Sequence, residues 1–136
     1  SYDAGDEVNQ IDWSRKKTYS AVNEYFRGLI ALRRAHPVFR LRTAEDVRQR
    51  LKFVQSGLPA AEAIAFTLDG AGVPGETWKE VAVLINPTPR PLKFHLPVEG
   101  ECAVFIRGNR ASKTAIERVA AEVEVAPRSL LLAARE

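Results

Sequence analysis

The chain contains few of the residues that build covalent or metal-held frameworks. Its 136 residues include one cysteine, Cys102, and two histidines, His36 and His95. A single cysteine excludes an internal disulfide and a cysteine-based zinc site, and the histidines share no short metal-ligand spacing. No run of about 18 apolar residues is present, which predicts no membrane span. A complete (β/α)8 barrel needs roughly 250 residues, so the length excludes that fold.

Common catalytic motifs are also absent. There is no Gly-x-Ser-x-Gly turn and no glycine-rich phosphate loop between a strand and a helix. We expect His36, just before Pro37, to be a helix-end cation or to hydrogen-bond helix carbonyls. We expect His95 to face solvent on a strand and Cys102 to be a buried, inert thiol. The residues therefore indicate no catalytic group, no metal and no cofactor.

Positive charge is concentrated in the first 54 residues, which hold 11 Lys or Arg against 7 Asp or Glu, whereas the rest holds 9 against 10. An excess of this kind permits binding to anions. However, no aromatic residues are interleaved with these cations as single-stranded nucleic acid would require. We therefore expect a solvated helical face and no nucleic-acid partner. The cations are Arg33, Arg34, Arg40, Arg42, Arg48, Arg50 and Lys52.

The first 60 residues predict a loop followed by two helices. Residues 1–17 are polar and turn-rich, which favours an irregular loop. Apolar residues then recur at helical spacing and predict a helix over 18–35, ended by Pro37. Gly28 inside it costs about 1 kcal/mol relative to alanine, which indicates a close packing contact. Thr43 is a predicted cap for a short helix over 44–54. The apolar stripe of the long helix comprises Val22, Phe26, Leu29 and Ile30.

Beyond residue 60 the apolar period becomes two. The continuous apolar run at 81–85 is typical of a central strand, and the other short runs are separated by proline and glycine turns. This spacing predicts a mainly β fold, an antiparallel β-sandwich preceded by the two helices. The other predicted strands lie near residues 64–68, 92–96, 102–106, 119–125 and 130–132.

Residues 2–13 combine carboxylates, amides and aromatic rings, among them Tyr2, Asp6, Asn9 and Trp13. Planar polar groups can hydrogen-bond sugar hydroxyls, and an aromatic ring can lie against the apolar face of a pyranose. The same composition also fits an acidic surface loop in which Trp13 is a packing anchor. The residues alone leave both interpretations open.

Three stretches resemble the pullulanases of the α-amylase superfamily, glycoside hydrolase family 13. Residues 1–13 resemble the segment near the end of the catalytic barrel, and the run GLIALRRAHP at 28–37 resembles its final helix. TAEDVRQRLKF at 43–53 resembles the linker that follows. The resemblance implies three parts, namely the barrel end at 1–37, a linker at 38–59 and a C-terminal β-sandwich at 60–136.

The resemblance further implies that the parent enzyme hydrolyses α-1,6-glucosidic bonds in pullulan, starch or glycogen. None of the acids here matches the family's catalytic motifs, so no catalytic residue is carried over and this part alone is expected to be inactive. Asp6, Asn9 and Tyr2 are implied to contact glucan, with Trp13 packed beneath the loop. The implied partners are the α-glucan substrate and the missing catalytic barrel, with self-association when the barrel is absent.

Two alternatives remain at this point. The sandwich could be a stand-alone glucan-binding module, for which only Trp78 is a candidate platform because Phe66, Phe94 and Phe105 occupy inward positions of the pattern. It could also be a plain interaction domain, which would leave the GLIALRRAHP run without an explanation.

Overall fold

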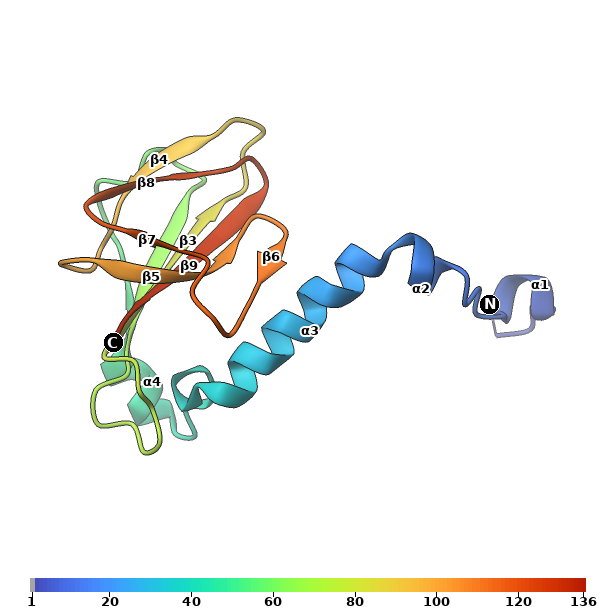
Figure 1. Ribbon diagram of the computed structural model, residues 1–136, viewed down its shortest axis with the longest axis horizontal. Helices are drawn as coiled ribbons and strands as arrows, with labels where there is room; N and C mark the ends of the chain where they lie inside the picture. The colour runs from blue at the N-terminus through green and yellow to red at the C-terminus, as the bar shows by residue number, and fades with distance from the viewer. Residues whose placement is uncertain (1) are drawn as a thin grey trace.

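A helical arm leads into a β-sandwich in the computed structural model, which describes residues 2–136 (Figure 1). Instead of the uninterrupted loop predicted for residues 1–17, two four-residue helices are present there. The long helix begins two residues later than predicted and ends at Ala35, before Pro37. The helices are α1 (Asp6–Asn9), α2 (Arg15–Thr18), α3 (Ser20–Ala35), the 3-10 turn η1 (Pro37–Arg40) and α4 (Ala44–Arg50).

The predicted second helix is correct at its start and wrong at its end. Thr43 caps α4, because its Oγ1 accepts a hydrogen bond of 3.0 Å from the backbone N–H of Asp46. Residues 51–53 are not helical but form strand β1 (Leu51–Phe53), which pairs antiparallel with β2 and places Phe53 opposite Phe66. Pairing with a neighbouring strand therefore overrides the helical pattern of this short stretch.

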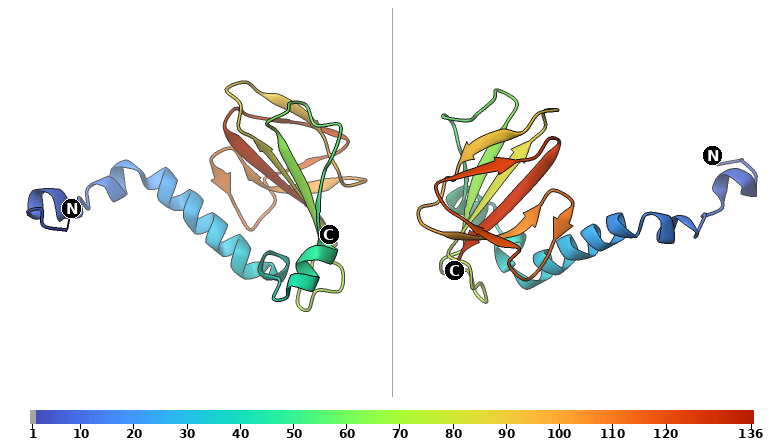
Figure 2. Two further views of the ribbon diagram at one scale, coloured as in Figure 1. Left: turned by 180° about the vertical axis from the view of Figure 1, so that it is seen from behind. Right: turned by 45° about the horizontal axis from the view of Figure 1, so that its top comes forward.

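Two antiparallel sheets form the sandwich (Figure 2). The large sheet has the order β1-β2-β3-β9-β5-β6, and β7 also pairs with β5. The small sheet pairs β4 with β8. The mainly antiparallel β fold predicted from the sequence is confirmed. The remaining strands are β2 (Ile64–Asp69), β3 (Glu80–Asn86), β4 (Leu92–His95), β5 (Cys102–Arg107), β6 (Arg110–Ala111), β7 (Glu117–Val119), β8 (Glu122–Val125) and β9 (Ser129–Arg135).

The large sheet buries both of its faces. On one face Leu84 of β3 and Phe94 of β4 belong to a core closed by the small sheet. On the other face Val81 joins a second core with Leu32 of α3 and Val38 of η1. A strand buried on both sides has no polar alternation, which explains the continuous apolar run of β3. Cys102 is fully buried, as predicted, and its burial raises the pKa of the thiol.

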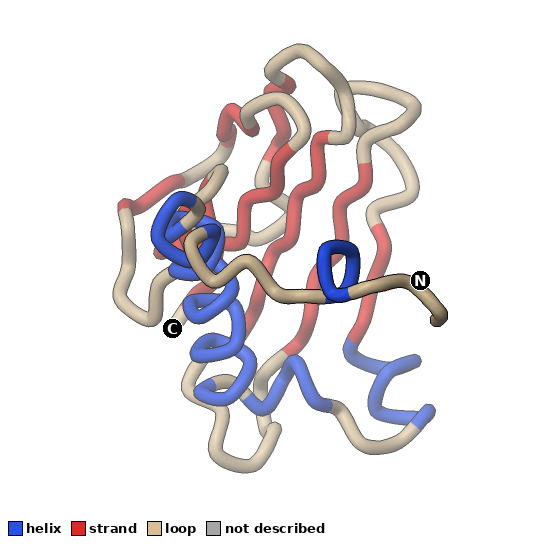
Figure 3. Tube along the Cα trace, turned by 90° about the vertical axis from the view of Figure 1, so that its right-hand side faces the viewer, coloured by secondary structure: helices blue, strands red, loops and turns tan. Residues whose placement is uncertain are grey.

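The long helix rests on the sandwich along one face only. A Cβ added to Gly28 would lie 2.2 Å from the backbone oxygen of Ala111 in β6, so the predicted close contact at Gly28 is confirmed. Figure 3 shows α3 lying across one end of the sheet. The opposite side of the helix stays exposed, including Val22, Phe26 and Ile30. No helix within residues 2–136 is long and apolar enough to cross a membrane.

Candidate functional site

The segment predicted to contact glucan lies at the far end of the helical arm. Tyr2, Asp6 and Asn9 are all exposed, and α1 lies well away from the sandwich (Figure 1). Asp6 and Asn9 are three positions apart on α1, a spacing that places two side chains on one side of a helix. The Asn9 amide donates a hydrogen bond of 2.6 Å to the backbone oxygen of Ala4, which leaves its own carbonyl oxygen as an acceptor.

An open groove of about 930 Å³ separates this segment from the start of α3. Its lining mixes carboxylates with aromatic rings, including Glu7, Trp13, Tyr19 and Phe26. Trp13 is 72% exposed in this chain, and the expectation that it packs beneath the loop of an intact barrel stays a prediction. The groove therefore combines the two kinds of side chain that recognise sugars, namely polar planar groups and aromatic rings.

Asp12 lines the same groove but is occupied by a local turn. Its Oδ1 accepts hydrogen bonds from the Ser14 hydroxyl, at 2.6 Å, and from the Ser14 backbone N–H, at 3.0 Å. Arg15 lies 3.4 Å from its other oxygen. The hydrogen bonds from Ser14 lower the pKa of this carboxyl. Asp12 thus fixes the chain between α1 and α2.

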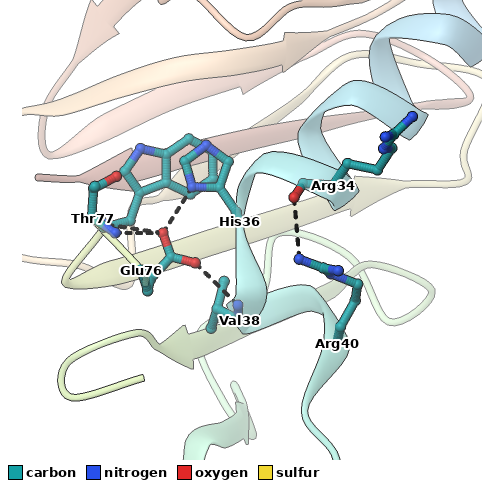
Figure 4. Close-up of polar contacts among 7 residues, drawn as sticks. Arg34, His36, Val38, Arg40, Glu76 and Thr77 are labelled. Carbon is teal, nitrogen blue, oxygen red and sulfur yellow. Dashed lines mark hydrogen bonds and ion pairs between the residues drawn. The ribbon is translucent and has the colours of Figure 1, made fainter. Parts of the chain in front are cut away.

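A second polar cluster lies where α3 meets the sandwich (Figure 4). His36 is 8% exposed, and its ring stacks on Trp78 with centroids 3.3 Å apart. Its Nδ1 lies 2.8 Å from Oε1 of Glu76, in the loop before β3. The expected hydrogen bond from His36 to the helix carbonyls is wrong, because its ring nitrogen meets the distant carboxylate of Glu76 and its ring lies against Trp78. Glu76 lies forty residues away in the chain, and no local pattern near His36 points to it.

Glu76 is held by hydrogen bonds from both sides of this junction. Its side chain is fully buried, and it accepts backbone N–H bonds from Val38, Thr77 and Trp78 at 2.9–3.1 Å. Burial would raise its pKa, but the hydrogen bonds from His36, Val38, Trp78 and Thr77 together outweigh it and lower the pKa. An ionised, fully bonded carboxylate joins η1 to the loop before β3 and is unsuited to proton transfer.

The remaining predicted candidates are far from either cluster. His95 faces solvent, as expected, with its ring nitrogen 3.4 Å from Glu122. Trp78 is 2% exposed, so it cannot serve as a sugar platform. Within residues 2–136, no three His, Cys, Asp or Glu side chains come together as metal ligands would.

Residues 9–129 match the family model described as alpha-1,6-glucosidases, pullulanase-type, C-terminal. Pullulanase of Bacillus subtilis strain 168 is 34% identical over 97 residues, covering 71% of this chain and 13% of that protein. The structure of pullulanase from Bacillus acidopullulyticus has a TM-score of 0.88 and 35% identity, covering 99% of this chain and 16% of that one. Pullulanase from Paenibacillus barengoltzii, in complex with maltohexaose and alpha-cyclodextrin, has a TM-score of 0.74 and 35% identity, covering 95% and 19%.

The match extends over most of the chain, whereas the chain spans less than a fifth of each of these three relatives. The fold agrees with this match, with TM-scores of 0.88 and 0.74 to the two solved structures. The chain therefore belongs to the family of C-terminal regions of pullulanase-type alpha-1,6-glucosidases.

Proposed function

We propose that these 136 residues are the C-terminal part of a debranching enzyme that hydrolyses α-1,6-glucosidic bonds in pullulan, starch or glycogen. The observation that carries this proposal is the match of residues 9–129 to the pullulanase C-terminal family, together with relatives several times longer than this chain. Within that enzyme the chain has a structural, non-catalytic role. Residues 1–37 complete the catalytic barrel, 38–59 form the linker, and 60–136 form the C-terminal sandwich.

The partner of the helical arm is then the catalytic part of the same enzyme. Val22, Phe26 and Ile30 are each more than half exposed on α3. Burying an apolar side chain of this size contributes about 1.5–3 kcal/mol, so covering all three would stabilise the enzyme by several kcal/mol. Their exposure on the flank opposite Gly28 supports a second contact surface on α3.

The N-terminal segment is the proposed glucan contact. Asp6 and Asn9 supply carboxylate and amide oxygens on one side of α1, and Tyr2 supplies an exposed ring. These groups are suited to accept hydrogen bonds from glucose hydroxyls and to stack on a sugar face. In the whole enzyme the segment would follow the last barrel strand, at the face where barrel enzymes build their sites.

A stand-alone glucan-binding module is the weaker alternative. Such a module needs exposed aromatic rings in a row, but Trp78, Phe94 and Phe105 are all buried. Affinity electrophoresis in a pullulan gel separates the two functions. A structural region of an enzyme migrates without retardation, whereas a module is retarded.

The test of the proposed function uses the longer enzyme encoded by the surrounding gene. We expect that enzyme to release reducing sugar from pullulan and the 136-residue chain to release none. Asp6→Ala in the longer enzyme should raise KM for pullulan, because a hydrogen bond to the bound sugar is lost. Glu24→Ala should not, because Glu24 is an exposed residue of α3 one turn before Gly28, away from the flank of Phe26. Activity of the isolated chain, or identical kinetics for Asp6→Ala and Glu24→Ala, would contradict the respective assignment.

A further inference from the structure

The fold gathers part of the basic stretch between residues 33 and 52 around one cavity of about 380 Å³. Arg40 comes from the end of η1, Arg42 from the following loop and Arg50 from the end of α4. The opposite wall is the loop between β2 and β3, which lies beside α4 (Figure 1). We call this cavity the arginine hollow. The function proposed above does not use it.

Two of the three guanidinium groups are held in place by backbone oxygens. Arg50 donates from Nη1 to the carbonyls of Asp69 and Ala71, at 3.1 and 2.7 Å. Arg40 donates from Nη2 to the carbonyl of Arg34 at 3.1 Å. Each guanidinium carries five N–H donors, so these bonds fix the groups while several donors remain. The side chain of Arg42 makes no hydrogen bond or ion pair within residues 2–136.

The carboxylates near the hollow leave it positively charged. Asp46 is the acid in its lining, and that carboxylate accepts a hydrogen bond of 2.6 Å from the Thr43 hydroxyl. Asp69 lies 3.9 Å from Arg50. Three arginine residues line one cavity, and a bound anion would offset this excess of positive charge. Guanidinium groups match phosphate oxygens in pairs, through two parallel hydrogen bonds.

The rest of the lining is apolar. Half-buried Leu41 and Val73 form part of the wall, and they offer a surface for carbon atoms rather than for a second charge. We propose that the arginine hollow binds a phosphate monoester of a small molecule, with the phosphate on the arginines and the carbon skeleton on this apolar wall. The hollow is thereby a ligand site separate from the glucan contact at α1.

Isothermal titration calorimetry of the 136-residue chain tests the proposal, with glucose 1-phosphate, inorganic phosphate and methyl glucoside as probes. Glucose 1-phosphate should bind with one-to-one stoichiometry and more tightly than inorganic phosphate, and an excess of methyl glucoside should not displace it. Arg42→Gln should weaken binding about tenfold, because a charge-assisted hydrogen bond is lost. Since Arg42 makes no internal bond, this variant should melt at the wild-type temperature.

Arg27→Gln is the charge-matched control, because Arg27 is an exposed arginine on α3 outside the hollow. Its affinity should equal that of the wild type. An equal loss in both variants would reduce the effect to general charge attraction and overturn the proposal. Absence of saturable binding at millimolar concentrations would also overturn it, as would inorganic phosphate binding as tightly as the monoester. None of these outcomes bears on whether the longer enzyme cleaves pullulan.

Discussion

The helical arm, residues 6–35, leaves most of its apolar side chains exposed, whereas the strands between residues 51 and 135 bury most of theirs. Helices α1 and α2 contain no buried residue, and α3 contains one, Leu32. In β3 alone, four consecutive residues from Val81 to Leu84 are buried. A helix forms its backbone hydrogen bonds within itself, whereas burying its apolar face needs a second surface. In the sandwich, the two sheets cover each other's apolar residues. The arm contacts the sandwich along one flank of α3 only.

Two phenylalanines make this comparison measurable, since Phe94 is 1% exposed in the sandwich and Phe26 is 58% exposed on the arm. The largest effect is expected for Phe94→Ala, which should lower the free energy of unfolding by about 3–5 kcal/mol because it leaves a cavity in the core. Urea denaturation monitored by circular dichroism measures it. Lys93→Ala, at the exposed neighbouring position, should have a much smaller effect. Equal losses would mean that β4 does not close the core.

The next largest loss of stability is expected at the junction between the arm and the sandwich. Glu76→Gln keeps the shape of the side chain but removes the ionised acceptor of four hydrogen bonds. Since hydrogen bonds to a charged group are worth about 1.5–3 kcal/mol, we expect a loss of about that size at pH 7, measured by urea denaturation. His36→Gln, which can still donate to Glu76 but cannot stack on Trp78 in the same way, should lose less.

The lowered pKa of Glu76 also sets the direction of the pH effect. A carboxyl with a depressed folded-state pKa stabilises the fold above its unfolded value of 4.5, and this contribution is lost as pH falls through the folded pKa. The difference in stability between wild type and Glu76→Gln should therefore be full at pH 6 and shrink below pH 4.5. Asp12 and Glu122 also have lowered pKa values, but they are present in both proteins. A difference that stays constant down to pH 3 would contradict the assignment.

Much of the sandwich could be predicted because its pattern is local. Residues 81–85 read as a central strand, and β3 lies between β2 and β9 with both faces buried. Gly28 could be read as a close contact, since a glycine in mid-helix is costly without one. The strand at 51–53 could not be predicted, because its apolar residues also fit the spacing of the preceding helix. Only its pairing with β2 makes these residues a strand.

Contacts between residues far apart in the sequence could not be predicted from local patterns. Nothing near His36 in the sequence points to Glu76 and Trp78, because the loop that carries them reaches His36 only after the sheet has formed. The proposed glucan contacts Tyr2, Asp6 and Asn9 rest on the resemblance of residues 1–13 to the pullulanase family. Asp6 and Asn9 are exposed on α1 and Tyr2 is exposed before it, and their role in binding glucan stays a prediction.

A smaller effect is expected at the contact between α3 and β6. Gly28→Ala gains about 1 kcal/mol of helix propensity, but its Cβ would lie 2.2 Å from the backbone oxygen of Ala111. Overpacking of this kind costs about 1–3 kcal/mol, so the net change in urea denaturation should be a loss of up to about 2 kcal/mol. Asn23→Ala, on the exposed side of the same helix, should be neutral or slightly stabilising. If Gly28→Ala behaves like Asn23→Ala, then α3 does not rest on β6.

The smallest effect on the fold, and the sharpest test of the arm, is expected for Phe26→Ala. Because its ring is mostly exposed, the free energy of unfolding of the dilute chain should change by no more than about 0.5 kcal/mol. The same ring should matter for association between copies. Val22, Phe26 and Ile30 would contribute about 1.5–3 kcal/mol each when covered, against an association cost of about 4–15 kcal/mol, so self-association should be weak.

Sedimentation velocity over a range of protein concentrations checks this association. The wild type should show a rise in mean sedimentation coefficient at high concentration, and Phe26→Ala should reduce it, because the central ring of the exposed flank is gone. Arg27→Gln, beside it on the helix, serves as the control and should leave the rise unchanged. A loss of stability in Phe26→Ala as large as that in Phe94→Ala would place Phe26 in a closed core and remove the distinction between arm and sandwich. Unchanged association with unchanged stability would instead leave the flank of α3 exposed but uninvolved in contacts between copies.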